Sequence, residues 1–318
     1  MNDTPSAHRP SSSQPPANES ECAVDVVIVG GGPSGCGAGI STARYGLETL
    51  VFDRGNASLR QCAYLENFLG FPGGIDVPTF YDLMHDHVSS AGGEVIADRV
   101  CDVTAIDSGF RVDTDDDRTI TAPFVVATSS YDGGYLRGLD DDTELFETHC
   151  HDGETHEHFD SEYVREQGRT PIDGLYVAGG LAGHGEQALI AAGHGMTVGR
   201  ALLEDVRRAD GWWDEVAPHY DWRRRTESFQ HDFDDTEALH ELFDATRLPD
   251  DHNIDDSVHE RVRATAIELF TNSHIDRDTV DQRIAEGYDR LVAQLDQSQL
   301  LERIDDDVIE RYVRESDQ

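Results

Sequence analysis

The chain has 318 residues, of which 64 are acidic and 25 basic, giving a formal net charge of −39 at pH 7. All 25 basic residues are arginine. This acidic, lysine-free composition extends over both halves of the chain and is typical of adaptation to a salt-rich cytoplasm, where screening relieves charge repulsion. It argues against nucleic-acid binding. No apolar run reaches the ~18 residues of a membrane span, so we expect a cytoplasmic protein of a halophile.

The cysteines and the N-terminal segment point to the same compartment. The first 22 residues are rich in Pro, Ser and Asn without an apolar core, which predicts a disordered tail and not a signal peptide. No two cysteines form C-x-x-C, and an odd number of scattered cysteines predicts reduced thiols in an intracellular protein. The five cysteines are Cys22, Cys36, Cys62, Cys101 and Cys150.

The most informative segment follows this tail. A β-branched apolar run, residues 24–29, predicts a strand buried on both faces of a parallel sheet. It leads into Gly30-Gly31-Gly32-Pro33-Ser34-Gly35, which fits G-x-G-x-x-G, and then into a predicted helix over residues 36–45. A second predicted strand, residues 49–52, ends at Asp53, where a carboxylate can accept hydrogen bonds from an adenosine ribose. Strand, glycine turn, helix and acid together predict a dinucleotide-binding site.

Further segments carry a resemblance to a known family. Residues 61–75 (QCAYLENFLGFPGGI), followed by a predicted helix over 78–91, resemble the flavin domain of thioredoxin reductases, in which the asparagine matching Asn67 contacts FAD. The apolar run 122–129 resembles the segment that returns to FAD, residues 170–180 (TPIDGLYVAGG) its late FAD motif, and Gln187-Ala188 the helix start that caps the flavin. The resemblance covers residues 23–130 and 170–207.

The resemblance implies an α/β fold, a doubly wound, Rossmann-like FAD-binding domain. It also implies a set of FAD-binding residues: Gly30, Gly32, Pro33, Ser34, Gly35, Asp53, Arg54, Asn67, Thr128, Gly179, Gly180, Gln187 and Ala188.

The chain departs from the family pattern in three ways. Only residues 130–169 stand where the family has a complete NADPH domain, and they hold neither a second glycine motif nor C-x-x-C. Forty residues accommodate little more than one βαβ unit, so we predict that the nicotinamide domain and the redox dithiol are absent. Gly180 replaces the family's FAD-anchoring aspartate. Glu186 replaces an arginine.

The insertion, residues 131–169, is rich in histidine. A hairpin turning at residues 152–153 is expected to bring its histidines together. Imidazoles and a thiol suit Zn or Cu, but a polar surface hairpin has the same pattern, and we predict no metal. The candidate ligands for such a metal are His149, His151, His156 and His158. The hairpin could instead cover the flavin.

The sequence does not identify the catalytic group, which stays unknown. Cys62, in the segment that crosses the flavin, and His149 and Cys150, in the hairpin, are the candidates. Cys36 and Cys101 are predicted to be small core residues.

The remaining elements complete the expected organisation. Residues 94–97 and 100–106 predict strands, and residues 110–121 a hairpin around an acidic turn. Residues 208–318 predict a helical C-terminal region with apolar residues at i, i+4 spacing. A capping box is expected at Ser257 and Glu260.

The function expected from this sequence is that of an FAD-dependent oxidoreductase without its own NADPH domain, with the substrate left open. Electrons would come from NAD(P)H as a transient donor or from a small-molecule or protein redox partner. A non-enzymatic flavin-binding redox sensor that signals through the helical region is the alternative, and NAD in place of FAD is a third reading. The helical region could also form a homodimer.

Overall fold

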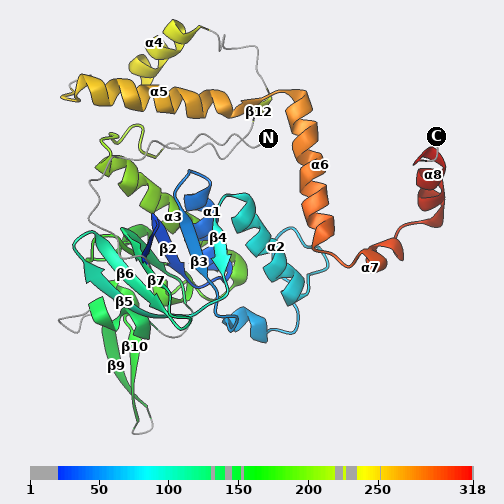
Figure 1. Cartoon of the computed structure of the whole chain (residues 1–318), viewed down its shortest axis with the longest axis horizontal. Coiled ribbons are helices and arrows are strands. Elements are labelled where there is room, and N and C mark those ends of the chain that lie inside the picture. The colour runs from blue at the N-terminus through cyan, green and yellow to red at the C-terminus, as the bar shows by residue number, and fades with distance from the viewer. Residues whose placement is uncertain are drawn as a thin grey trace. The chain divides into compact units, whose positions relative to one another are not determined.

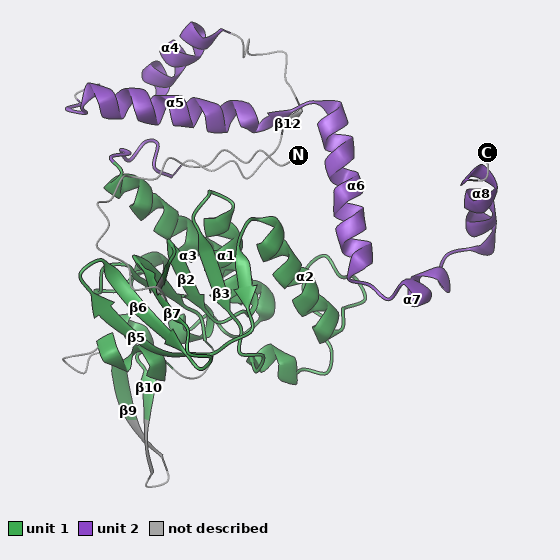
Figure 2. Ribbon diagram, viewed as in Figure 1, with its two compact units in different colours: residues 1–210 green, residues 211–318 purple. Residues whose placement is uncertain are grey.

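The computed structural model describes residues 21–129, 133–139, 145–151, 154–218, 225–226, 235–250 and 252–316. The expected tail, apart from its last two residues, therefore lies outside the described residues. The chain divides into two compact units, residues 1–210 and 211–318 (Figure 2).

Unit 1 is built on a five-stranded parallel sheet whose strand order is β11-β8-β2-β3-β4. Figure 1 labels β2, β3 and β4 of this sheet. Four of its strands, all except β4, are buried almost throughout, in agreement with their largely apolar sequences. The strands are β2 (Val26–Val29), β3 (Thr49–Phe52), β4 (Glu94–Ile96), β8 (Phe124–Ala127) and β11 (Leu175–Val177).

Alternate side chains of β2 face two different layers. Val26 and Ile28 pack with the helices α1 (Pro33–Ala43), α2 (Val77–Ser90) and α3 (Ala188–Ala209). Val27 and Val29 pack with residues of a second, four-stranded sheet. Unit 1 is thus a three-layer α/β fold of the expected doubly wound, Rossmann-like class, with the parallel sheet in the middle.

The second sheet has the order β1-β7-β6-β5. Its strands are β1 (Glu21–Ala23), β5 (Val100–Ile106), β6 (Gly109–Thr114) and β7 (Thr119–Ala122). β6 pairs antiparallel with β5 and β7, whereas β1 pairs parallel with β7. Glu21 and Cys22 therefore lie in a strand, although the sequence assigned them to the tail.

Helices α1 and α3 approach each other so closely that only glycine fits at several contacts. A Cβ atom on Gly195 would lie 1.9 Å from the backbone oxygen of Ser34, and one on Gly37 would lie 2.5 Å from that of Ala192. These contacts join the helix after the glycine turn to the helix that follows the late segment. The two segments flanking the insertion thereby form one structural unit.

Arg169 and Asp205 add a polar connection beside this helix pair. The Arg169 guanidinium donates to both carboxylate oxygens of Asp205, at 2.7 and 2.9 Å, and the Tyr176 hydroxyl donates to the same carboxylate at 2.7 Å. Burial acts to raise the pKa of Asp205, but the Arg169 and Tyr176 hydrogen bonds outweigh it and hold the pKa below its ordinary value.

The insertion forms the antiparallel hairpin of β9 (Phe146–His151) and β10 (Glu154–Phe159). At its base, Phe159 is buried in the core of unit 1, and Phe146 packs against it at a ring distance of 6.2 Å. The backbone register places His149 opposite His156, His151 opposite Glu154 and His158 opposite Glu147. Because strand residues alternate between faces, these six positions share one face of the hairpin.

Unit 2 is helical and has its own small core. Trp212, Phe243, Val262 and Ala266 are buried together. The helices are α4 (Thr236–Arg247), α5 (Asp256–Asn272), α6 (Arg277–Ala293), α7 (Gln297–Leu301) and α8 (Asp306–Ser316), and β12 (Arg225–Thr226) pairs with β13 (His274–Ile275).

The structure corrects two expectations about unit 2. The capping box was wrong, because the N-cap of α5 is Asp255, whose carboxylate accepts from the Ser257 backbone N–H, so Ser257 already lies in the first turn. The i, i+4 pattern of α5 does correspond to its buried side. The similar pattern of α6 does not, since Ile284 and Tyr288 are exposed. Among the described residues, no helix is long and apolar enough to cross a membrane.

Candidate functional site: a dinucleotide-sized cavity above the parallel sheet

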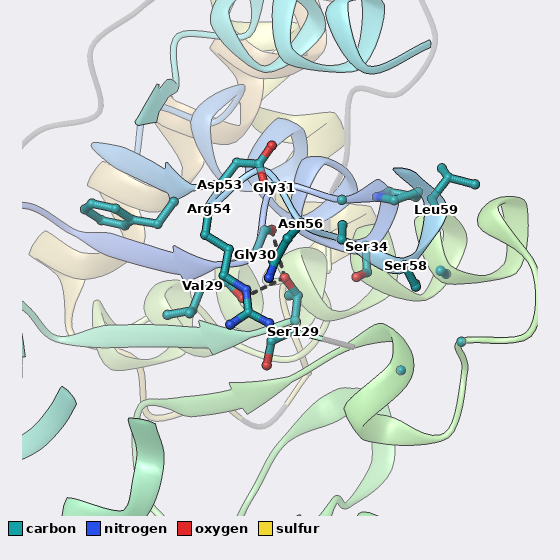
Figure 3. Close-up of a pocket in the computed structure, with 18 of the residues that line it drawn as sticks. Val29, Gly30, Gly31, Ser34, Asp53, Arg54, Asn56, Ser58, Leu59 and Ser129 are labelled. Carbon is teal, nitrogen blue, oxygen red and sulfur yellow. Dashed lines mark hydrogen bonds between the residues drawn. The ribbon is translucent and has the colours of Figure 1, made fainter. Parts of the chain in front are cut away.

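A cavity of about 570 Å³ opens at the carboxyl ends of β2, β3 and β8 (Figure 3). Parallel α/β sheets bind their ligands at this edge. The cavity is lined by the glycine turn after β2, the segment after β3, the end of β8, and the late segment before α3. In Figure 3, Arg54 and Asn56 extend from the segment after β3 toward Ser129, which follows β8.

The glycine turn is shaped by its backbone contacts. Gly30 has a φ of +123°, which disfavours any residue with a side chain. A Cβ on Gly35 would lie 1.7 Å from the Gly30 backbone oxygen, so Gly35 lets the helix start directly against the turn. Gly32 differs from both, because a Cβ there would meet nothing closer than the Tyr81 hydroxyl oxygen, at 3.8 Å. Gly32 thus leaves space toward the cavity.

Two helices present their N-termini to this cavity, and neither has a side-chain cap. Gly32 is the N-cap of α1, with Pro33 in the first turn, and Gln187 is the N-cap of α3. By contrast, aspartate side chains cap α2, α4, α5, α6 and α7. Uncapped N-terminal N–H groups and the helix dipole favour an anionic ligand. The cavity therefore has two anion-attracting ends.

Asp53 lies at the end of β3 with its side chain only 7% exposed. One carboxylate oxygen accepts from the Gly55 backbone N–H at 2.9 Å, and the other accepts from Arg60 at 3.0 Å. The His85 imidazole lies 3.6 Å from the same carboxylate and 3.0 Å from the Gly31 backbone oxygen. This network holds a negative charge at the position expected for ribose recognition, already balanced by Arg60.

The end of β8 secures the glycine turn from the side. The Thr128 hydroxyl lies within hydrogen-bond distance of the backbone oxygens of Val29 and Gly30, at 3.0 and 2.9 Å. Its role in this structure is to fix the turn, although it also lines the cavity. Next to it, the Ser129 and Tyr135 hydroxyls lie 3.1 Å apart.

The late segment also borders the cavity and lies close to the start of α1. Gly179 has a φ of +68°, and a Cβ on it would lie 2.4 Å from the Ser34 hydroxyl oxygen. Its backbone N–H donates to Nδ1 of His194 at 3.1 Å, which requires that nitrogen to be unprotonated. Burial, together with the neighbouring His184, lowers the pKa of His194 to about 4, so the acceptor is present at neutral pH.

Most of the residues predicted to bind a cofactor line this one cavity. They are Gly30, Gly32, Pro33, Ser34, Asp53, Arg54, Thr128, Gly180, Gln187 and Ala188. Three others are elsewhere. Gly35 and Gly179 support the walls as described above, and Asn67 is an exposed residue that does not line the cavity. Gly180, the position of the family's aspartate, faces the cavity without a side chain.

The burial of the cysteines differs from the expectation at one position. Cys36 is buried, as predicted, and burial, with Asp53 nearby, raises its pKa to about 12, which keeps it a neutral thiol. The prediction for Cys101 was wrong: it is exposed and lines the cavity, because a register irregularity between Val100 and Asp102 interrupts the strand. Cys62 is also exposed and lines the cavity. The side chains of Cys150, His149, His151 and His156 lie outside the described residues; His158 is exposed.

Sequence reasoning missed several lining residues. Tyr81, Asn56, Arg99 and Tyr135 all line the cavity. Tyr81 lies on α2, which the sequence predicted only as a helix over residues 78–91. None of the four belongs to a pattern that indicates ligand contact, so only the fold could identify them. Among the described residues, no group of three or more His, Cys, Asp or Glu side chains could hold a metal.

Comparisons with known proteins agree with this site. Residues 24–132 match the family model described as pyridine nucleotide-disulphide oxidoreductase. The chain is 37% identical over 93 residues to a thioredoxin reductase of Streptomyces coelicolor, covering 28% of each chain. It is 32% identical over 107 residues to that of Aquifex aeolicus, covering 33% of each chain. The match thus spans about a third of these relatives' length.

Among solved structures, a thioredoxin reductase from Gloeobacter violaceus aligns with a TM-score of 0.47 at 15% identity, covering 59% of this chain and 95% of that one. One from T. acidophilum aligns with a TM-score of 0.45 at 17% identity, covering 58% and 99%. The sequence matches thus make about a third of this chain similar to thioredoxin reductases and to the pyridine nucleotide-disulphide oxidoreductase family.

Proposed function

We propose that this protein is an FAD-dependent oxidoreductase that binds FAD in the cavity of unit 1. The observation that carries the proposal is that one cavity is lined both by the glycine turn and by the late segment at Gly180, Gln187 and Ala188. The fold thus brings two segments that are far apart in the sequence to one ligand-sized space. Gly30, Gly32, Ser34 and the N-terminus of α1 would hold the pyrophosphate.

The residues present fit this cofactor in two respects. The open space over Gly32 is of the kind that a phosphate requires for close approach to the backbone. The uncapped N-termini of α1 and α3 leave N–H groups available for anionic parts of a ligand. When bound, FAD would supply the redox chemistry, while the protein groups position it and exclude competing reactions.

We further propose that the chain works without its own nicotinamide domain or redox dithiol. In the described part of residues 133–169 the chain forms short 3-10 turns and the β9–β10 hairpin, with no helix-and-sheet unit among them. NAD(P)H would then act as a transient donor, or a protein would deliver the electrons. The redox-sensor alternative gains no support from the comparisons, which indicate oxidoreductases.

The first test is the absorption spectrum of the full chain purified in molar salt, before and after reconstitution with FAD. We expect the spectrum of bound flavin, which NADPH or NADH should bleach under anaerobic conditions, with repeated reoxidation by an added acceptor. Flavin that binds without many turnovers would favour a sensor. A protein that binds no flavin after reconstitution would contradict the proposal.

The Gly32→Ala variant tests the proposed position of the pyrophosphate. In Gly32→Ala the new Cβ would occupy the space proposed for the pyrophosphate, while the backbone there is an ordinary extended one (φ −81°). We expect FAD affinity to fall about tenfold or more, with unchanged stability of the ligand-free protein. Gly73→Ala is the matched control, since it also has open space around it but lies outside the cavity lining.

A further inference from the structure

The buried hydroxyl of Tyr81, near the glycine turn, lacks a hydrogen-bond partner. Tyr81 is only 1% exposed, and its hydroxyl has no hydrogen-bond partner in the structure, the one such buried side-chain atom found among the described residues. Leaving a buried hydroxyl unpaired carries a free-energy cost. An unpaired buried hydroxyl therefore indicates a hydrogen-bond partner that a bound ligand supplies.

The position of this hydroxyl indicates what that partner is. It is the nearest atom to the open space over Gly32, 3.8 Å from where a Cβ would lie, and Tyr81 lines the cavity. Gly32 is also the N-cap of the 11-residue helix α1, which has no side-chain cap. Any group bound over Gly32 therefore lies beside both the hydroxyl and the helix N-terminus.

The Tyr81 ring lies among Arg60, His85 and Asp53. The Arg60 guanidinium stacks on the Tyr81 ring, with Cζ 3.8 Å from the ring centroid, while also pairing with Asp53. His85 packs edge-on against the ring, at a centroid distance of 5.7 Å. Burial, with Asp53 nearby, raises the pKa of Tyr81 above its ordinary value, so the phenol keeps its proton and can act only as a neutral donor to an anion.

We propose that the Tyr81 hydroxyl donates a hydrogen bond to a phosphate oxygen of the bound dinucleotide over Gly32, and so acts as an additional phosphate-positioning residue. This inference rests on the proposed function. It would also supply a polar contact to a cavity in which Gly180 stands at the position of the family's aspartate. A small movement of the side chain toward the ligand completes the contact.

The test is the binding of FAD and ADP to the full chain and to its Tyr81→Phe variant, measured by titration calorimetry in molar salt. A hydrogen bond to a charged group corresponds to about a tenfold change in affinity or more. We expect FAD and ADP to bind about tenfold more weakly to the variant, whereas adenosine, which lacks phosphate, should bind equally to both. Tyr64→Phe is the matched control, since the Tyr64 hydroxyl donates to the Gly73 backbone outside the cavity.

A second readout does not depend on the ligand. Because the hydroxyl lacks a partner, the melting temperature of ligand-free Tyr81→Phe should equal or exceed that of the unaltered protein. A lower melting temperature, FAD and ADP affinities within twofold of the original, or an equal loss for adenosine would each overturn the inference. If the unaltered protein binds neither FAD nor ADP, the proposed function itself fails, which is a separate outcome.

Discussion

Helix α3 of unit 1 and helix α6 of unit 2 both have amphipathic sequences, yet the structure uses them differently. α3 is buried along one side and contacts the backbone of α1 through glycine. None of the described residues of α6, α7 or α8 is buried, and Tyr288 in α6 is 65% exposed. α6 begins with an aspartate cap, whereas the N-terminus of α3 is left for the cavity.

The difference shows that an apolar stripe predicts a helix but not its burial. What fixes α3 is the set of backbone contacts, which its small residues permit and which no periodicity reveals. What maintains α6 is local: its cap, its i, i+4 ion pairs such as Arg290 with Glu286, and intrinsic propensity. The predictions below test this contrast, from the largest expected effect to the smallest.

The largest effect is expected at the contact between α1 and α3. Gly195→Ala would place a Cβ 1.9 Å from the Ser34 backbone oxygen, so the two helices must separate, and we expect unit 1 to lose about 3 kcal/mol or more of unfolding free energy. Gly193→Ala in the same helix has open space and should instead gain roughly 0.5–1 kcal/mol. Denaturant titration measures both. Equal effects of the two substitutions would contradict the close contact.

A second pair compares apolar residues of the two helices. Leu202 in α3 is fully buried, so Leu202→Ala should cost about 2–5 kcal/mol of unfolding free energy. Leu291 in α6 is 39% exposed, and Leu291→Ala should change stability by less than about 0.5 kcal/mol. Thermal unfolding at several protein concentrations checks both. A large, concentration-dependent loss for Leu291→Ala would show that α6 is buried in a homodimer.

The pH dependence of stability reports on His194. Its pKa is lowered to about 4 in the folded protein by burial and by His184, whereas an unfolded histidine has a pKa of about 6.5. Between these values the unfolded chain binds the additional proton, so stability should fall as the pH drops from about 6.5 to 4.

The matched variant for this effect is His194→Asn, which can retain an acceptor for the Gly179 N–H but does not titrate. Its unfolding free energy should depend less steeply on pH over the same range. His87, whose pKa is lowered by burial and by Arg44, contributes in the same direction and should account for part of the remaining slope. A slope identical to that of the original protein would contradict the assignment to His194.

A small stabilising effect is expected in the middle of α6. Gly287 has no atom within 4 Å of an added Cβ, so Gly287→Ala should stabilise this helix by roughly 0.5–1 kcal/mol and leave flavin binding unchanged. Far-UV circular dichroism during unfolding measures it. A destabilised variant would indicate that α6 has a close neighbour at this position.

The sequence predicted the parts of the fold that depend on local patterns. The strands around the glycine turn and the hairpin of the insertion have the expected positions because alternation, apolar runs and glycine spacing act over short distances. Tyr81 could not be identified, since its role depends on where α2 lies relative to Gly32. Cys101 was misassigned because one irregularity in strand pairing changes which residues face the core.

The contact between Ser34 and Gly195 also affects how the chain folds during synthesis. These residues are 161 positions apart, and β11, which completes the central sheet beside β8, follows the insertion as well. Native pairing across so long a separation is slow to form. During synthesis, the glycine turn leaves the ribosome well before the helix that packs against it. The first 130 residues must remain without β11 and α3 until α3 has emerged.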